Sequence, residues 1–126
     1  MMPAQLRLDP DRSPLASRQV RDALAALATE CSTQAPDDVL LVASELVTNA
    51  VQHTSGAVHV SAWLSNEDRW RVEVDDESTA EPSLRSRGDS PAVPGGLGLH
   101  IVDAAATVWG VDETPSGKRC WFELQV

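Results

Sequence analysis

Two alternating segments on either side of one short polar turn constrain the fold of this chain more than any other feature. Residues 57–64 read AVHVSAWL and residues 70–74 read WRVEV. Strict alternation of apolar and polar residues is typical of strands with one buried face. The Asn-Glu-Asp run at 66–68 supplies turn residues between them. We therefore predict an antiparallel hairpin, whose first strand buries Val58, Val60 and Ala62.

Two segments before the hairpin carry the spacing of amphipathic helices. The first begins at Ser13, a favoured N-cap residue, followed by Pro14 at the first helical position. The second runs from Pro36 to about His53, with two aspartates in its first turn, where carboxylates complement the helix dipole. Its apolar side, expected to pack on the sheet, consists of Ala43, Leu46, Val47, Ala50 and Val51.

The remaining pattern completes a two-layer architecture. We expect a short strand at 5–8, a helix at 96–106, and strands at 108–111 and 120–126, with the aperiodic segment 75–95 as a loop. This order predicts an α+β two-layer sandwich: a mainly antiparallel mixed sheet of about five strands with three helices on one face. At 126 residues, the chain has the size of a single domain, residues 1–126.

The charge balance limits the classes of partner. Ten basic against nineteen acidic residues leave a net charge of −9, and a nucleic-acid-binding protein ordinarily shows a basic face. Binding a polyphosphate would need a divalent cation or well-placed backbone N–H groups. Cys31 and Cys120 lack CxxC spacing and are expected to be free thiols. Without a run of 18 apolar residues or an apolar leader, we expect a cytoplasmic protein that does not bind membranes.

Three short segments carry candidate chemistry. Glu45, Asn49 and His53 are spaced i, i+4, i+8 and share one side of the second helix. Such a stripe is ordinarily a solvated helix face, but asparagine is a poor mid-helix residue. A carboxylate and a carboxamide one turn apart also offer oxygens to a hard cation or an activated water.

The second segment is a strand end, Asp75-Asp76, and the third is a glycine turn, PGGLGL, at a helix start. Strand-end aspartates are often only turn formers. Glycines at a helix start let backbone N–H groups approach an anion. The turn fits neither the dinucleotide fingerprint, because Ile101 stands where a glycine is required, nor a P-loop, because no GK[ST] follows.

Taken in order, these segments resemble the Bergerat-fold ATPase superfamily of histidine kinases, gyrase B, the heat-shock chaperone and MutL. SELVTNAVQHT is similar to the N-box, VDDES to the strand-end aspartate motif, and GGLGLHIV to the glycine motif. The glycine motif lies at the end of the ATP lid in this superfamily. The short lid and the terminal GKRCWFEL segment are most similar to those of the bacterial anti-sigma-factor serine/threonine kinases and their stand-alone relatives. The resemblance covers roughly residues 6–126.

The resemblance implies a role for individual residues in binding ATP and Mg²⁺. Asn49 matches the asparagine that binds Mg²⁺ bridging the phosphates, and Glu45 matches the general base of the kinase branch. Asp76 matches the aspartate that accepts a hydrogen bond from the adenine amino group, and Asp75 takes that place only if the register slips by one. Gly96 and Gly98 match the glycines whose backbone meets the phosphates.

Two departures from the family pattern concern recognition of the base. Ser78 stands where the Asp-x-Gly motif has a glycine. Arg119 is interpreted as a replacement of the threonine usual on the penultimate strand, whose hydroxyl helps hold the aspartate and an adenine-bound water. Both favour weak or altered nucleotide use, whereas Glu45 and Asn49 are retained.

Three functions therefore stay open. The first is a kinase that phosphorylates an antagonist protein and sequesters a sigma factor in transcription regulation. The second is a non-catalytic, nucleotide-gated module that sequesters a protein partner. The third is an interaction protein without nucleotide. The resemblance also leaves a homodimer open.

Overall fold

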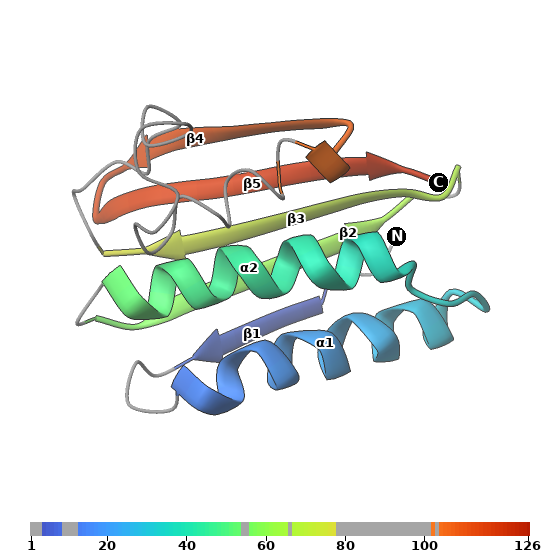
Figure 1. Ribbon diagram of the computed structural model, residues 1–126, viewed down its shortest axis with the longest axis horizontal. Coiled ribbons are helices and arrows are strands. Elements are labelled where there is room, and N and C mark those ends of the chain that lie inside the picture. The colour runs from blue at the N-terminus through green and yellow to red at the C-terminus, as the bar shows by residue number, and fades with distance from the viewer. Residues whose placement is uncertain (1–3, 9–12, 54–55, 66, 78–101, 103) are drawn as a thin grey trace.

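The computed structural model describes residues 4–8, 13–53, 56–65, 67–77, 102 and 104–126. Five strands and two helices occur in this part of the chain (Figure 1). In chain order they are β1 (Ala4–Leu8), α1 (Ser13–Glu30), α2 (Asp37–His53), β2 (Val58–Leu64), β3 (Arg69–Asp76), β4 (Val108–Thr114) and β5 (Gly117–Gln125). The strands form one sheet in the order β1-β2-β3-β5-β4, and each neighbouring pair is antiparallel.

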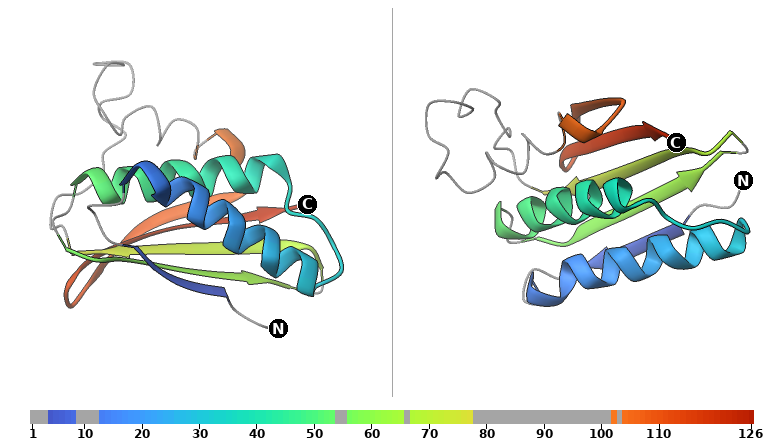
Figure 2. Two further views of the ribbon diagram at one scale, coloured as in Figure 1. Left: turned by 90° about the horizontal axis from the view of Figure 1, so that it is seen from below. Right: turned by 45° about the vertical axis from the view of Figure 1, so that its right-hand side comes forward.

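Both helices cover the same face of the sheet (Figure 2). Helix α1 contacts β1 and β2, and helix α2 contacts β2 and β3. The arrangement is therefore the α+β layering that the sequence predicts, with a helical layer on one side of an antiparallel sheet. None of the described helices combines the length and apolar character needed to cross a membrane.

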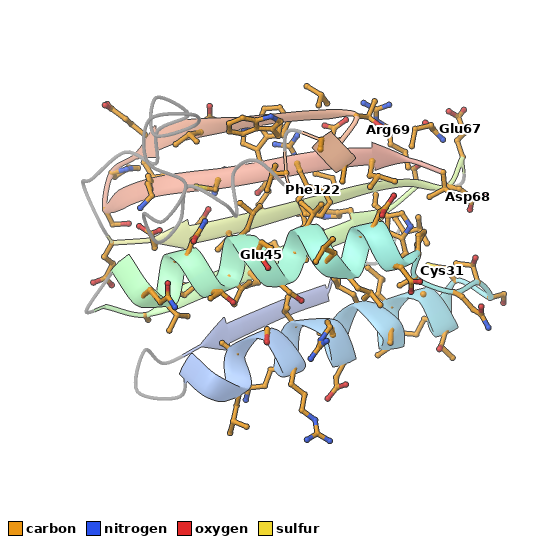
Figure 3. All side chains as sticks on the ribbon, viewed as in Figure 1. Cys31, Glu45, Glu67, Asp68, Arg69 and Phe122 are labelled. Atoms are coloured by element: carbon orange, nitrogen blue, oxygen red, sulfur yellow. The ribbon has the colours of Figure 1, made fainter. Side chains whose placement is uncertain are left out.

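The core lies between the two layers, and the alternating segments supply its sheet side. Exposure alternates along β2, β3 and β5, as expected for strands with one buried face. Trp70 and Phe122 are the largest fully buried side chains, and Phe122 is labelled in Figure 3. The predicted inward residues are all buried: Ala43, Leu46, Val47, Ala50 and Val51 on α2, and Val58, Val60 and Ala62 on β2.

The strands are longer at their polar ends than the sequence predicts. β5 begins at Gly117 rather than at residue 120, β4 reaches Thr114 rather than residue 111, and β3 runs through Asp76. Backbone pairing continues there because the charged side chains of β3 and β5 find partners across the ladder. Pro115 and Ser116 form the turn between β4 and β5.

Most of the predicted third helix, including Gly96 and Gly98, and most of the predicted loop lie outside the described residues. At the end of that helix, the backbone N–H of Ala106 donates to the carbonyl of Val102 at 2.9 Å, which is helical spacing. Val102 is fully buried in the hydrophobic core, and Ala105 and Ala106 are partly buried side chains that pack against this core.

The two cysteines differ in environment and should differ in reactivity. Both are free thiols, as predicted, with Cys31 exposed and Cys120 buried. Burial raises the pKa of the Cys120 thiol to about 11. Because the thiolate is the nucleophile, we expect iodoacetamide at neutral pH to label Cys31 and to leave Cys120 unmodified. Mass spectrometry with and without denaturant measures this, and equal labelling of both cysteines in the folded protein would contradict the buried position of Cys120.

Candidate functional site

Asp76 is a buried carboxylate at the end of β3. Only 3% of the residue is exposed, and it occupies the helix-facing side of the sheet, in line with the buried residues Val72 and Val74. A buried carboxylate is costly unless it is paired or hydrogen-bonded. The neighbours of Asp76 therefore decide what this strand end can bind.

Lys118 on β5 supplies the counter-charge. The strand register places it directly opposite Asp76. Its ammonium donates to Asp76 Oδ1 at 3.0 Å and lies 2.9 Å from Oδ2. Lys118 is itself only 7% exposed, so two opposite charges are buried together. An ion pair of this kind is strongly destabilised when one partner is removed, because the other charge is then left uncompensated.

Arg119 and Asp75 form a second pair on the opposite face of the sheet. Arg119 Nε donates to Asp75 Oδ1 at 2.7 Å and Nη2 donates to Oδ2 at 2.9 Å. This hydrogen bonding with Asp75 raises the pKa of the arginine. The prediction that Arg119 lies beside Asp76 is therefore wrong. Successive strand residues point to opposite faces, and Lys118 holds that position instead.

Sequence reasoning missed Lys118, although the pattern contained a signal. In GKRCWFEL, the buried residues Cys120, Phe122 and Leu124 alternate with more exposed ones. Extending that alternation by one step places Lys118 on the buried face. A lysine is seldom placed in a core by inspection, because lysines are almost never fully buried unless they are paired.

Helix α2 carries the other two candidate residues that the structure describes. Glu45 and Asn49 are one turn apart and half-buried. Glu45 is labelled near the middle of α2 in Figure 3. Helix α2 contacts β3, the strand that ends in Asp76. The structure thus brings Glu45, Asn49 and Asp76 onto two contacting elements, whereas the side chain of His53 lies outside the described set.

Two glycines let backbone segments approach the end of β3. A Cβ on Gly117 would lie 2.7 Å from Glu77 Cα and would collide with the carbonyl oxygen of Asp76. Gly56, just after α2, similarly leaves room for the Glu77 carboxylate. Gly56 and the start of β5 therefore both lie close to the end of β3 at Asp76 and Glu77. A larger residue at Gly117 would have to displace the strand that carries Asp76.

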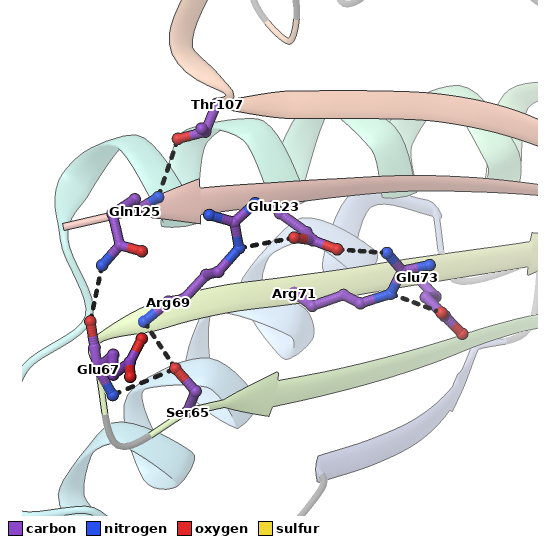
Figure 4. Close-up of polar contacts among 8 residues, drawn as sticks. All are labelled: Ser65, Glu67, Arg69, Arg71, Glu73, Thr107, Glu123 and Gln125. Atoms are coloured by element: carbon purple, nitrogen blue, oxygen red, sulfur yellow. Dashed lines mark hydrogen bonds and ion pairs between the residues drawn. The ribbon is translucent and has the colours of Figure 1, made fainter.

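The outer face of the sheet carries a separate charge network (Figure 4). Arg69 and Arg71 each donate to Glu123 at 2.7 Å, and Arg71 also donates to Glu73 at 2.9 Å. The Arg71 guanidinium lies 4.4 Å from the centre of the Trp121 ring. The hydrogen bond from Arg69 holds the pKa of Glu123 below its ordinary value. These charges satisfy one another and lie on the face opposite Asp76.

Comparison with known proteins shows the family to which this chain belongs. The model of the histidine kinase-like ATPase domain matches residues 9–123. The chain belongs to that family, and the resemblance to Bergerat-fold ATPases is confirmed. No match to a curated protein was found by sequence comparison.

Two solved structures share the fold. The chain matches the RsbU and RsbW domains of Rv1364c from Mycobacterium tuberculosis with a TM-score of 0.69 and 21% identity, covering 99% of this chain and 32% of that one. It matches the histidine kinase domain of the blue-light activated histidine kinase from Erythrobacter litoralis EL346 with a TM-score of 0.52 and 20% identity, covering 70% of this chain and 43% of that one. The chain thus spans less than half of either structure.

The described residues fit the nucleotide that this family implies. Asp76 provides a buried carboxylate acceptor for an exocyclic amine, and Glu45 and Asn49 provide oxygens on the adjoining helix. Within the described ranges, no three His, Cys, Asp or Glu side chains gather to hold a metal ion. Asn49 would hold Mg²⁺ together with phosphate oxygens, which is the usual way in which Mg²⁺ binds beside a nucleotide.

Proposed function

We propose that this chain is an ATP-binding regulatory domain that uses Mg-ATP to control a protein partner, as an anti-sigma-factor-like serine/threonine protein kinase. The observation that carries the proposal is the buried Asp76 carboxylate at the end of β3, beside the helix that bears Glu45 and Asn49. It occurs in a chain of the histidine kinase-like ATPase family. We treat residues 1–126 as one such domain.

Each residue has a distinct part in this proposal. Asp76 accepts a hydrogen bond from the adenine amine, and the backbone of Gly96 and Gly98 donates to the phosphates. Asn49 would hold Mg²⁺, whose charge would neutralise that of the triphosphate. Glu45 takes the proton of the attacking serine or threonine hydroxyl. An acidic chain of net charge −9 can hold a polyphosphate in this way, because the metal and the N–H groups supply the positive potential.

The partner is proposed to be a protein, either a sigma factor or its antagonist. The sequence resemblance to the anti-sigma-factor branch supports this, as does the structural likeness to a protein with an RsbW domain. The net charge of −9 argues against nucleic acid as the ligand. A homodimer is compatible with the proposal.

Asp76→Asn is expected to reduce the affinity for ATP and ADP by at least about tenfold, because the amide offers an N–H toward the adenine N–H where the carboxylate offered an acceptor. Asp75→Asn, the neighbouring residue on the opposite face, is the matched control and should leave affinity unchanged. Calorimetry with Mg-ATP and Mg-ADP on the folded variants measures both. Equal affinity in wild type and Asp76→Asn would remove Asp76 from the base site, and no nucleotide binding by the wild type would refute the proposed function.

A non-catalytic, nucleotide-gated binding module is the second candidate. Phosphoryl transfer separates the two candidates. Radiolabelled ATP is incubated with the wild-type chain and the proteins that co-purify with it. Label on a partner supports the kinase, whereas nucleotide-dependent capture of a partner that never acquires label supports the binding module.

A further inference from the structure

The Lys118 ammonium is buried and has unused hydrogen-bonding capacity. Its side chain is 9% exposed, and its contacts are with the two carboxylate oxygens of Asp76. An ammonium carries three N–H donors. Among the residues that the structure describes, the Lys118 ammonium donates a hydrogen bond to Asp76 and to no other residue. At least one buried N–H is therefore left for something else to satisfy.

A buried N–H without an acceptor destabilises the folded protein, and a ligand that supplies an acceptor removes this penalty. Lys118 stands directly across the ladder from Asp76, so the donor lies beside the carboxylate. A carboxylate has about four lone-pair sites, more than one ammonium can fill. The two residues together present an acceptor and a donor about one hydrogen-bond length apart.

This arrangement is complementary to the edge of a nucleobase that carries a donor next to an acceptor. Adenine has such an edge, because its exocyclic amine stands beside the ring nitrogen N1. Arg119 cannot act in the same way, because it lies on the opposite face and both its Nε and Nη2 are engaged with Asp75.

We propose that Lys118 is a base-recognition residue: it donates to N1 of adenine while Asp76 accepts from the adjacent amine. The inference rests on the proposed function, because it names how the same site reads its nucleotide. Recognition then depends on two contacts, one to N1 and one to the amine. A base without the acceptor leaves one N–H of the buried ammonium unpaired, and a base without the amine offers Asp76 no donor.

The test compares ATP with 1-deaza-ATP, in which a C–H replaces N1 and the amine is kept. Calorimetry with Mg²⁺ present measures both affinities for four proteins: wild type, Lys118→Met, Lys118→Arg and the outer-face control Arg119→Met. We expect wild type and Arg119→Met to prefer ATP by about tenfold to a hundredfold, the effect of leaving one buried donor unpaired. Lys118→Met should bind both nucleotides with the same weakened affinity.

Lys118→Arg keeps the positive charge against Asp76 and so guards against a Lys118→Met variant that does not fold. Its planar guanidinium places the donors differently, and we expect the preference for ATP to shrink to less than about threefold. The readout is binding alone and does not depend on phosphoryl transfer.

Several results would overturn the inference, and they can be told apart. Equal wild-type affinities for ATP and 1-deaza-ATP would exclude a contact to N1 while leaving ATP binding intact. An undiminished preference for ATP in both lysine variants would assign that preference to another residue. Tighter ATP binding by Lys118→Met would show that the lysine blocks the site. Failure of the wild type to bind either nucleotide would refute the proposed function itself.

Discussion

Lys118→Met is expected to lower the free energy of unfolding by about 3–5 kcal/mol, because it leaves the buried Asp76 carboxylate without a counter-charge. The same substitution at the next residue, Arg119→Met, is expected to cost no more than about 1 kcal/mol. Its pair with Asp75 lies at the surface, where water and salt screen it. The Arg119 side chain is 38% exposed, against 9% for Lys118. Urea unfolding at neutral pH, followed by circular dichroism, measures both.

A third variant shows whether the loss comes from the unpaired charge. Asp76→Asn combined with Lys118→Met removes both charges, and it should recover part of the stability lost in Lys118→Met alone. If Lys118→Met and Arg119→Met lowered the free energy of unfolding equally, water would reach the Asp76–Lys118 pair as readily as it reaches the Asp75–Arg119 pair. The two residues are adjacent in sequence, so the comparison isolates the face of the sheet on which a charge lies.

The layering and the core were predictable because hydrophobic periodicity determines which side of each element is buried. The alternation in 57–64 and the apolar side of α2 both predicted residues that are buried in the structure. In the strand, a shift of one residue would turn the whole apolar set to solvent, so the pattern admits a single register. The free state of the two cysteines was predictable as well, because they lack CxxC spacing.

The charged ends of the strands were not predictable in the same way. In VDDE and GKRC, polar residues occupy both faces, so alternation no longer distinguishes a strand from a loop. The pairing of Asp76 with Lys118 and of Asp75 with Arg119 depends on the register between β3 and β5, strands that lie more than forty residues apart. Motif resemblance located Asp76, but it assigned the opposing position to Arg119, one residue away on the wrong face.

Glu45→Gln is expected to keep the affinity for Mg-ATP within a few-fold and to slow phosphoryl transfer by about 10²–10⁴-fold, the usual cost of losing a general base. The amide keeps the size of the side chain and one hydrogen-bonding oxygen, but it cannot take the proton of a serine or threonine hydroxyl. Because Glu45 is only half-buried on α2, we expect the change to glutamine to have little effect on the stability of the fold. Glu30→Gln, an exposed carboxylate at the end of α1, serves as the matched control.

The assay separates chemistry from binding. Calorimetry gives the affinity of each variant for Mg-ATP, and transfer of label from ATP to a co-purified partner gives the rate. A slow Glu45→Gln with wild-type affinity assigns the proton-accepting step to Glu45, because only the transition state needs a base there. Transfer at the wild-type rate would take that role from Glu45. A parallel loss of affinity would instead make it a binding residue, through Mg²⁺ or through the position of Asn49 one turn along the same helix.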